Sequence, residues 1–217
     1  RKKKLPIAYI LKYKHFWKSK FYVNKSVLIP RPATELIIEK VLEKVQKNQR
    51  LKILDIGTGS GCILISILLE RPKSTGIGID ISPSAIKVAK FNAKMQQLKN
   101  RIKFINSDVD KFFSYKYDVI VSNPPYINKL KYTNLQKDVK DYEPKIALDG
   151  GLRGISMVKK VIKKSSELLK KNGNLVLEID NQILRESKEL LKKYKFYIND
   201  VSKDLMNKHR CIFSTKN

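Results

Sequence analysis

The feature that most constrains the fold is an alternation of short apolar runs and helical patterns that begins at residue 51. Four runs have the length and apolar character of buried strands: residues 51–56, 76–81, 102–105 and 117–121. Helical patterns occupy residues 61–69 and 83–97 between them. Strands joined to helices by short connections predict a parallel sheet with helices on both faces.

The last third of the chain continues this pattern. Helices are expected around residues 155–169 and 182–193, and strands at 174–179, 196–201 and 210–214. A short loop joins the last two strands, so one of them must run antiparallel to its neighbour. The predicted fold class is therefore α/β, a doubly wound, seven-stranded sheet with one antiparallel strand, formed by residues 51–217.

Residues 1–50 are expected to form an appendage, since they are too few to hold a core of their own. Residues 16–29 are typical of a β-hairpin that turns at Asn24-Lys25, and Pro30-Arg31-Pro32 stops its second strand. A helix is expected to open at Ala33 or Thr34. The segment carries 14 basic and 3 acidic residues, which gives a net charge of +11.

The whole chain has a net charge of +26, and 38 of its 46 basic residues are Lys. Such an excess favours a nucleic-acid or ribosomal partner. Contacts that recognise base sequence prefer the Arg fork, so this composition predicts only weak, nonspecific attraction to nucleic acid. Coding bias in an AT-rich genome accounts for the excess equally well.

Other compositional features narrow the class of protein. No apolar stretch approaches the roughly 20 residues needed to cross a bilayer, so no membrane partner is expected. Cys62 and Cys211 are the only cysteines, which suggests a reducing compartment, the cytoplasm or an organellar matrix. His15 and His209 have no companions at ligand spacing, so no metal site is expected. The chain begins without Met, which suggests a fragment or a processed chain.

A glycine-rich loop, Gly57-Thr58-Gly59-Ser60-Gly61, joins the first strand of the alternation to its helix. Backbone N-H groups at a helix start predict a seat for an anion or a carboxylate. Dinucleotide-binding loops have the spacing Gly-x-Gly-x-x-Gly, whereas the spacing here is Gly-x-Gly-x-Gly. The loop therefore indicates a different ligand.

Acidic residues follow the next two strands. Asp80 ends the second strand, where a carboxylate is placed to accept hydrogen bonds from both hydroxyls of a ribose. Asp108 follows the third strand and could accept from the exocyclic amine of adenine, with Val109 beside the ring. Combined with the glycine spacing, these positions favour an adenosine that carries no pyrophosphate.

The fourth strand ends in Ser122-Asn123-Pro124-Pro125-Tyr126. Two prolines stop the strand and stiffen the loop. The Asn123 side-chain oxygen and the Pro124 carbonyl are then two acceptors that point the same way and can bind a planar NH2 group. The ring of Tyr126 offers a flat face for stacking against an amide or a base.

Further motifs accompany these loops: Phe16-Trp17, Phe21-Tyr22-Val23, Val27-Leu28-Ile29-Pro30-Arg31-Pro32, Thr34-Glu35, Asn123-Pro124-Pro125-Tyr126-Ile127 and Tyr142-Glu143-Pro144. With them, residues 5 to about 180 resemble the class I S-adenosylmethionine-dependent methyltransferases, and more narrowly the HemK/PrmC family of protein-(glutamine-N5) methyltransferases. The Arg-Pro-x-Thr-Glu pattern is what narrows the resemblance.

The resemblance implies a Rossmann-like fold, S-adenosyl-L-methionine as cofactor, and peptide chain release factors as partners. The methyl group would go to the side-chain amide nitrogen (N5) of the glutamine in their Gly-Gly-Gln motif. It implies catalytic roles for Asn123, Pro124, Pro125 and Tyr126. It implies a cofactor site made of Gly57, Thr58, Gly59, Ser60, Gly61, Asp80, Asp108, Val109 and Asn123.

The chain also departs from the family pattern. Ala33 stands where members usually carry an acid, and residues 178–182 replace a more glycine-rich stretch. Members begin with a helical domain that helps hold the protein substrate, and these residues do not contain it. The departures bear on substrate affinity more than on chemistry.

Three other functions fit parts of the sequence. An adenine-N6 methyltransferase acting on DNA or RNA would use the same four loop residues on a flipped base and would explain the charge. A glutamine methyltransferase acting on a ribosomal protein is a second alternative. A noncatalytic RNA-binding module is a third, although the complete glycine loop, Asp80 and the complete Asn-Pro-Pro-Tyr loop argue against it.

Overall fold

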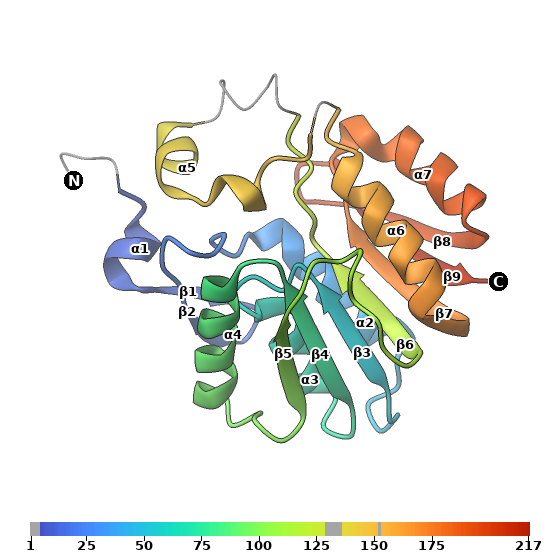
Figure 1. Ribbon diagram of the computed structural model, residues 1–217, viewed down its shortest axis with the longest axis horizontal. Coiled ribbons are helices and arrows are strands. Elements are labelled where there is room, and N and C mark those ends of the chain that lie inside the picture. The colour runs from blue at the N-terminus through green and yellow to red at the C-terminus, as the bar shows by residue number, and fades with distance from the viewer. Residues whose placement is uncertain (1–4, 129–135, 152) are drawn as a thin grey trace.

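The computed structural model describes residues 5–128, 136–151 and 153–217. Its central element is a seven-stranded sheet (Figure 1). From one edge to the other the strands are β5 (Ile102–Asn106), β4 (Thr75–Asp80), β3 (Lys52–Ile56), β6 (Tyr117–Ser122), β7 (Leu169–Glu178), β9 (His209–Lys216) and β8 (Phe196–Lys203).

Strand direction confirms the predicted fold class. The neighbours from β5 to β7 pair in parallel, and β9 is antiparallel to both β7 and β8. The chain runs outward from β3 to β4 and β5, then crosses back to β6 on the other side of β3. The strand order therefore reverses between β3 and β6, and ligands of open α/β sheets bind at the carboxyl ends of strands at such a point.

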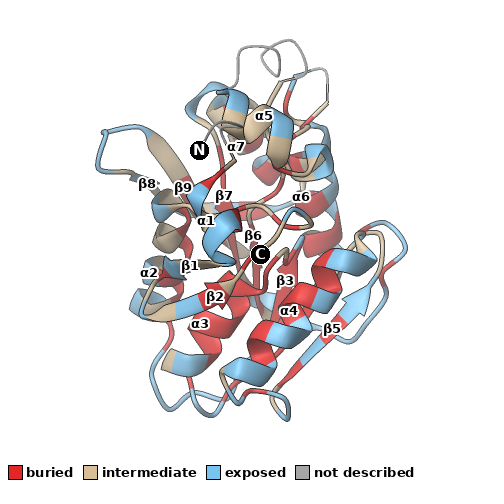
Figure 2. Cartoon of the chain, turned by 90° about the vertical axis from the view of Figure 1, so that its left-hand side faces the viewer, coloured by how far each residue is buried: buried red, intermediate tan, exposed pale blue. Residues whose placement is uncertain are grey.

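Helices cover both faces of the sheet. The helices α2 (Glu35–Lys44), α3 (Cys62–Glu70) and α4 (Pro83–Met95) share one buried cluster, and α6 (Ser156–Leu168) and α7 (Leu184–Lys193) share the other. Helix α3 is buried from Cys62 to Leu68 because it packs against both α2 and α4. Figure 2 shows the resulting pattern, with buried central strands and inward helix faces, and with exposed outer helix faces and partly exposed edge strands β5 and β8.

Short elements connect these layers. They are α1 (Ile7–Leu11), η1 (Pro32–Thr34), α5 (Lys137–Tyr142), η3 (Lys145–Ala147) and η4 (Asn181–Ile183). Helices α5 and η3 lie in the polar stretch between β6 and α6, for which the sequence predicted no element. Within the described residues, no helix combines the length and the apolar character that a bilayer crossing requires.

The N-terminal hairpin is present, but its predicted turn at Asn24-Lys25 is wrong. Strands β1 (Tyr13–Phe16) and β2 (Ser19–Tyr22) pair around a tight turn that begins at Trp17, whose φ is +52°. Residues 27–29 form no strand, because their backbone groups have side-chain partners instead. The Tyr9 hydroxyl donates to the Val27 carbonyl (2.6 Å), and the Ile29 N-H donates to a carboxyl oxygen of Glu143 (3.1 Å).

The hairpin is joined to the sheet by apolar packing and by one buried amide. Phe16 and Phe21 belong to the same buried cluster as residues of β3 and α3. On α4, Asn92 accepts a hydrogen bond from the Tyr22 N-H (2.8 Å) and donates to the carbonyls of Tyr22 (3.0 Å) and Ser60 (2.9 Å). Asn92 therefore ties the hairpin, α4 and the glycine loop together.

Candidate active site

The carboxyl ends of β3, β4 and β6 open into one cleft with about 1080 Å³ of empty space, including its open mouth. This is large enough for a small-molecule ligand. Ten of the residues singled out in the sequence line it together: Gly57, Thr58, Gly59, Ser60, Asp80, Asp108, Val109, Asn123, Pro124 and Pro125. Gly61 and Tyr126 are not among the lining residues.

The glycine loop differs from the expected anion seat. The N-H groups of Gly57 and Thr58 both donate to the Ile79 carbonyl (2.9 Å each), and the Gly59 N-H donates to Asp80 Oδ2 (2.9 Å). These N-H groups are therefore used within the protein and are not aimed at a ligand. Gly57 and Gly59 have φ of +74° and +55°, and a Cβ at either would meet no atom within 4 Å, so the loop offers a smooth open surface.

Two backbone N-H groups fix the carboxylate of Asp80 at the cleft. Its Oδ2 accepts from the Gly59 N-H and its Oδ1 accepts from the Ser82 N-H, each at 2.9 Å. Burial raises the pKa of this carboxyl, and the two backbone N-H groups oppose the increase. Each carboxylate oxygen keeps a lone pair for a further donor, so the arrangement fits a ligand with two neighbouring hydroxyls.

Behind the loop, Asp55 is fully buried at the centre of β3. Its Oδ2 accepts a hydrogen bond from the Thr58 hydroxyl (2.7 Å), and its Oδ1 has no partner among the described residues. Burial raises the pKa of Asp55 to about 7, and the nearby Asp80 charge adds to the increase. The hydrogen bond from Thr58 to Asp55 therefore stabilises the conformation of the glycine loop.

The residues that follow β5 contribute a half-buried acid and an apolar side chain to the cleft. Asp108 lines the cleft, and its Oδ1 accepts from the Asp110 N-H (2.8 Å), which leaves Oδ2 toward other donors. Val109 is 7% exposed and lines the same region. Both residues therefore lie at the cleft, beyond the end of β5.

The Asn-Pro-Pro-Tyr loop is fixed at its start by two side chains. The Ser122 hydroxyl donates to the Ile56 carbonyl (2.7 Å), which joins the end of β6 to the end of β3. Asn123 Nδ2 donates to Thr34 Oγ1 (3.0 Å). Neither Asn123 Oδ1 nor the Pro124 carbonyl accepts a hydrogen bond from the described residues, so both remain acceptors for a ligand.

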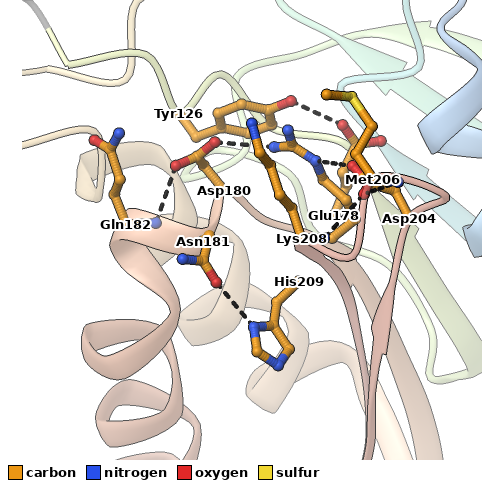
Figure 3. Close-up of polar contacts among 10 residues, drawn as sticks. Tyr126, Glu178, Asp180, Asn181, Gln182, Asp204, Met206, Lys208 and His209 are labelled. Carbon is orange, nitrogen blue, oxygen red and sulfur yellow. Dashed lines mark hydrogen bonds and ion pairs between the residues drawn. The ribbon is translucent and has the colours of Figure 1, made fainter.

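The loop is also fixed at its end. The Tyr126 hydroxyl donates to Glu178 Oε1 (2.9 Å), as Figure 3 shows. Burial and the Glu178 carboxyl both raise the pKa of Tyr126, so it stays protonated. Gly150 and Gly154 pack against the backbone of Tyr126, and a Cβ at Gly154 would come within 2.3 Å of the Tyr126 carbonyl oxygen.

Glu178 is a buried acid that sequence reasoning did not assign to the site. It ends β7, is 1% exposed, and has a pKa that burial raises against the effects of the Thr34 and Tyr126 hydroxyls. Beside it, Arg210 is paired with Asp180 and Asp204 (2.9 Å each). The sequence signal that could have identified Glu178 is a lone carboxylate within the apolar run of residues 175–179.

Glu143 is a second buried acid that sequence reasoning did not assign to the site. Glu143 is 5% exposed and accepts the Ile29 N-H, and it forms an ion pair with Arg31. Pro144 and Ala147, which follow it, line the cleft together with Arg31. Glu143 therefore holds the segment between β6 and α6 against the N-terminal segment.

Comparison with known proteins agrees with this geometry. A family described as "Methyltransferase domain" matches residues 47–214. The "Release factor glutamine methyltransferase" of Clostridium acetobutylicum is 38% identical over 219 residues, which cover 100% of this chain and 77% of that protein. The "Bifunctional methyltransferase" of Rickettsia typhi is 37% identical over 226 residues, and the match covers 95% of this chain and only 44% of that protein.

Among solved structures, a methyltransferase from Pyrococcus furiosus has the same fold, with a TM-score of 0.66 and 17% sequence identity. The match covers 91% of this chain and 88% of that one. The fold, the methyltransferase match and a relative that is 38% identical over the whole of this chain and 77% of its own length lead to one assignment. The chain belongs to the release factor glutamine methyltransferase family.

Proposed function

We propose that the protein transfers a methyl group from S-adenosyl-L-methionine to the side-chain amide nitrogen (N5) of the glutamine in the Gly-Gly-Gln motif of peptide chain release factors. The observation that carries the proposal is a pair of acceptors to which no described residue donates, Asn123 Oδ1 and the Pro124 carbonyl, beside a cleft that fits an adenosine. The family of the chain supports the same reaction.

The cofactor site is proposed from the residues that line the cleft. Asp80 would accept the ribose hydroxyls, Asp108 and Val109 would contact the adenine, and residues 57–61 with Asn123 would border the rest of the molecule. The bound cofactor supplies a methyl group on a positively charged sulfur. The open surface at Gly57 and Gly59 supports this placement, because a side chain at either position would project into the space that the cofactor needs.

The acceptor site is proposed from the Asn-Pro-Pro-Tyr loop. An amide nitrogen is a weak nucleophile because its lone pair is delocalised into the carbonyl. Asn123 and Pro124 would accept its two N-H bonds and so orient the nitrogen toward the methyl group, while Pro125 stiffens the loop and Tyr126 borders the amide. In the transfer, the methyl carbon would form a bond to the nitrogen as its bond to sulfur breaks, S-adenosylhomocysteine would leave, and water would take the proton that the nitrogen loses.

We propose that the chain has two parts with different roles at this site. Residues 51–217 form the methyltransferase domain, and residues 1–50 are an appendage that contributes Arg31 and Thr34 to the cleft. Release factors are the protein partner, and the excess of Lys adds only weak, nonspecific attraction to nucleic acid. The buried, unpaired thiols of Cys62 and Cys211 support a reducing compartment, the cytoplasm.

The experiment that tests this function uses labelled S-adenosyl-L-methionine with four acceptors in parallel: a release factor, the same factor with its motif glutamine changed to alanine, DNA or RNA, and a ribosomal protein fraction. The expected result is label on the first acceptor alone, on the motif glutamine by peptide mass spectrometry. Label on adenine would establish the nucleic-acid alternative, and label on a ribosomal protein fraction would establish the other glutamine substrate.

The proposed cofactor contact of Asp80 has its own test. Asp80→Ala removes the acceptor for two ribose hydroxyls, and hydrogen bonds to a charged group contribute about 1.5 to 3 kcal/mol each. We expect calorimetry to show at least 100-fold weaker binding of S-adenosylhomocysteine. Asp80→Asn, which keeps one acceptor oxygen, should fall between; unchanged affinity in the Ala variant would rule this placement out.

A further inference from the structure

A second cavity opens at the opposite end of the sheet from the cofactor cleft. It holds about 740 Å³ of empty space, including its open mouth, and its walls contain the first residues of β3, β4, β5 and β6. We call it the amino-end cavity. The cofactor cleft lies at the carboxyl ends of these strands, and strands of five or six residues separate the two by roughly 16 to 20 Å. A ligand in the amino-end cavity therefore leaves the cofactor cleft open.

Every charged side chain that lines the amino-end cavity in the described part of the chain is basic. These side chains are Lys52, Lys99, Arg101, Lys103 and Lys116. A groove between α4 and β5 shares Lys99 and Lys103 with the cavity. Its other basic residues are Lys90 and Lys94, and no acid lines it. The cavity and the groove therefore form one track of seven positive charges along the edge strand β5 (Figure 1).

Neighbouring acids do not neutralise this track. Within the described residues, none of the seven basic side chains forms an ion pair. Asp118 contacts the track, since its Oδ2 accepts the backbone N-H of Lys52 (2.8 Å), but its Oδ1 is paired with Lys170 (2.6 Å). The Lys116 ammonium donates to the backbone carbonyl of Glu167, which is neutral. Like charges gathered in this way repel one another, and a bound polyanion would remove the repulsion.

An exposed aromatic ring lies beside these charges. Tyr115 lines the amino-end cavity and is 87% exposed, so packing within the protein does not account for its position. Every base has a flat face, and stacking on an aromatic ring can therefore hold a nucleic-acid strand of any sequence while basic side chains follow its phosphates. An acidic peptide would use the charges of the track but would have no base to stack on the ring.

We infer that this track is a binding site for single-stranded nucleic acid, in which the lysines contact phosphates and Tyr115 stacks on an unpaired base. The site recognises the backbone and the flat face of a base, so it holds a strand regardless of its sequence. A strand bound there lies outside the cofactor cleft and is not the methyl acceptor. The inference goes beyond the proposed function and does not depend on it.

The ring is tested with two polyanions that differ in having bases. Isothermal calorimetry at low salt compares oligoadenylate of about 12 nucleotides, a usual site size, with inorganic polyphosphate of similar charge. Tyr115→Ala should weaken oligoadenylate binding at least about fivefold, the lower end of the loss from one stacked base, and should leave polyphosphate binding unchanged. Tyr115→Phe keeps the ring and should bind as the original protein does. Tyr197→Ala, which removes a ring of β8 that is 63% exposed, is the matched control.

The charges are tested with a pair of lysines that only the amino-end cavity contains. Changing Lys52 and Lys116 together to Gln should weaken both ligands. It should also reduce the slope of log affinity against log salt for oligoadenylate by about 1.4, since each phosphate contact of a single strand contributes about 0.7. Changing Lys192 and Lys193 on the exposed face of α7 to Gln removes the same charge and is the control. Melting temperatures establish that all variants are folded.

The inference is overturned if Tyr115→Ala binds oligoadenylate as tightly as the original protein, or if the two lysine pairs cause equal losses. Tighter binding of oligoglutamate than of oligoadenylate would assign the track to an acidic protein partner instead. Saturating oligoadenylate should leave the affinity for S-adenosylhomocysteine within about twofold. Displacement of S-adenosylhomocysteine would place the strand in the cofactor cleft and would also overturn the inference. None of these measurements uses a release factor, so their failure leaves the proposed function standing.

Discussion

Burial of a single carboxyl group lowers the free energy of unfolding of this protein by an amount that depends on pH. Asp55 is fully buried, has one oxygen without a hydrogen-bond partner in the described part of the chain, and has a pKa of about 7, whereas an unfolded chain ionises it near pH 4. The folded state therefore binds an extra proton between these two values. The free energy of unfolding falls as the pH rises through this window, because the charge is easier to form in the unfolded chain.

Asp55→Asn should remove this dependence. Integrating the two pKa values predicts that the free energy of unfolding of the variant gains about 2 to 3 kcal/mol relative to the original protein between pH 5 and pH 8. Urea unfolding of both proteins at these two pH values measures the gain, which includes the effect of the Asp55 charge on the neighbouring Asp80. Parallel pH profiles would show that Asp55 is already ionised in the folded protein at pH 5.

Asn123 should govern turnover more than stability or cofactor binding. Asn123→Ala removes one of the two acceptors proposed to hold the substrate amide, and loss of one preorganised polar contact typically lowers the rate about 100- to 1000-fold. Single-turnover rates with a release factor measure the effect, while the melting temperature and cofactor affinity serve as controls. A melting temperature that falls while the rate per folded molecule is kept would assign Asn123 a purely structural role.

At the scale of elements, Asn92 connects three parts of the chain that are distant in sequence. Its amide satisfies the N-H and carbonyl of Tyr22 in β2 and the carbonyl of Ser60 in the glycine loop, and it is 1% exposed. The positions of the hairpin and of the glycine loop are therefore coupled through Asn92 on helix α4.

Asn92→Leu should destabilise the protein and weaken cofactor binding together. It leaves up to three buried polar groups without partners, and each such group costs about 1 to 3 kcal/mol. We expect a loss of at least 2 kcal/mol in the free energy of unfolding and weaker binding of S-adenosylhomocysteine. Gln96→Leu, on the same helix, removes only an exposed hydrogen bond to the Lys20 carbonyl (3.2 Å) and is the matched control. Equal effects of the two substitutions would contradict the role of Asn92.

The helices and strands could be predicted from local sequence patterns, but most contacts within the site could not. The strands and main helices begin and end within a few residues of their predicted positions, except that β7 starts at Leu169 rather than 174, since apolar runs and glycine turns are local signals. The hairpin turn was misplaced because Asn24-Lys25 resembles a turn while Trp17 does not. The contacts of Thr34 and Glu178 with the Asn-Pro-Pro-Tyr loop were not predicted, because their partners in that loop are 89 and 52 residues away.

For the whole molecule, the charge of +26 is unevenly placed. Residues 81–107 contain six basic residues and no acid. Their fold forms a groove between α4 and β5 that is lined by Lys90, Lys94, Lys99 and Lys103. Within the described part of the chain, none of these four lysines forms an ion pair, so their charge is available to a polyanion.

Nonspecific binding of single-stranded RNA should therefore depend on this groove. Changing its four lysines to Gln should weaken binding and reduce the slope of log affinity against log salt by about 3, since each phosphate contact contributes about 0.7 for a single strand. The control replaces four exposed or half-exposed lysines of α6 and α7: Lys163, Lys188, Lys192 and Lys193. Fluorescence anisotropy at several salt concentrations compares the two, and equal losses would mean that only total charge matters.

The order of the strands also has a consequence for how the protein is made. Strand β9 follows β8 in the sequence, yet it lies between β7 and β8 in the sheet. Because domains begin to fold during synthesis, the strands from β3 to β7 can pair before β9 exists, whereas β8 has no place in the sheet until β9 is made. The residues that line the cleft lie between positions 26 and 161, so we expect the cleft to form in the nascent chain before the sheet is complete.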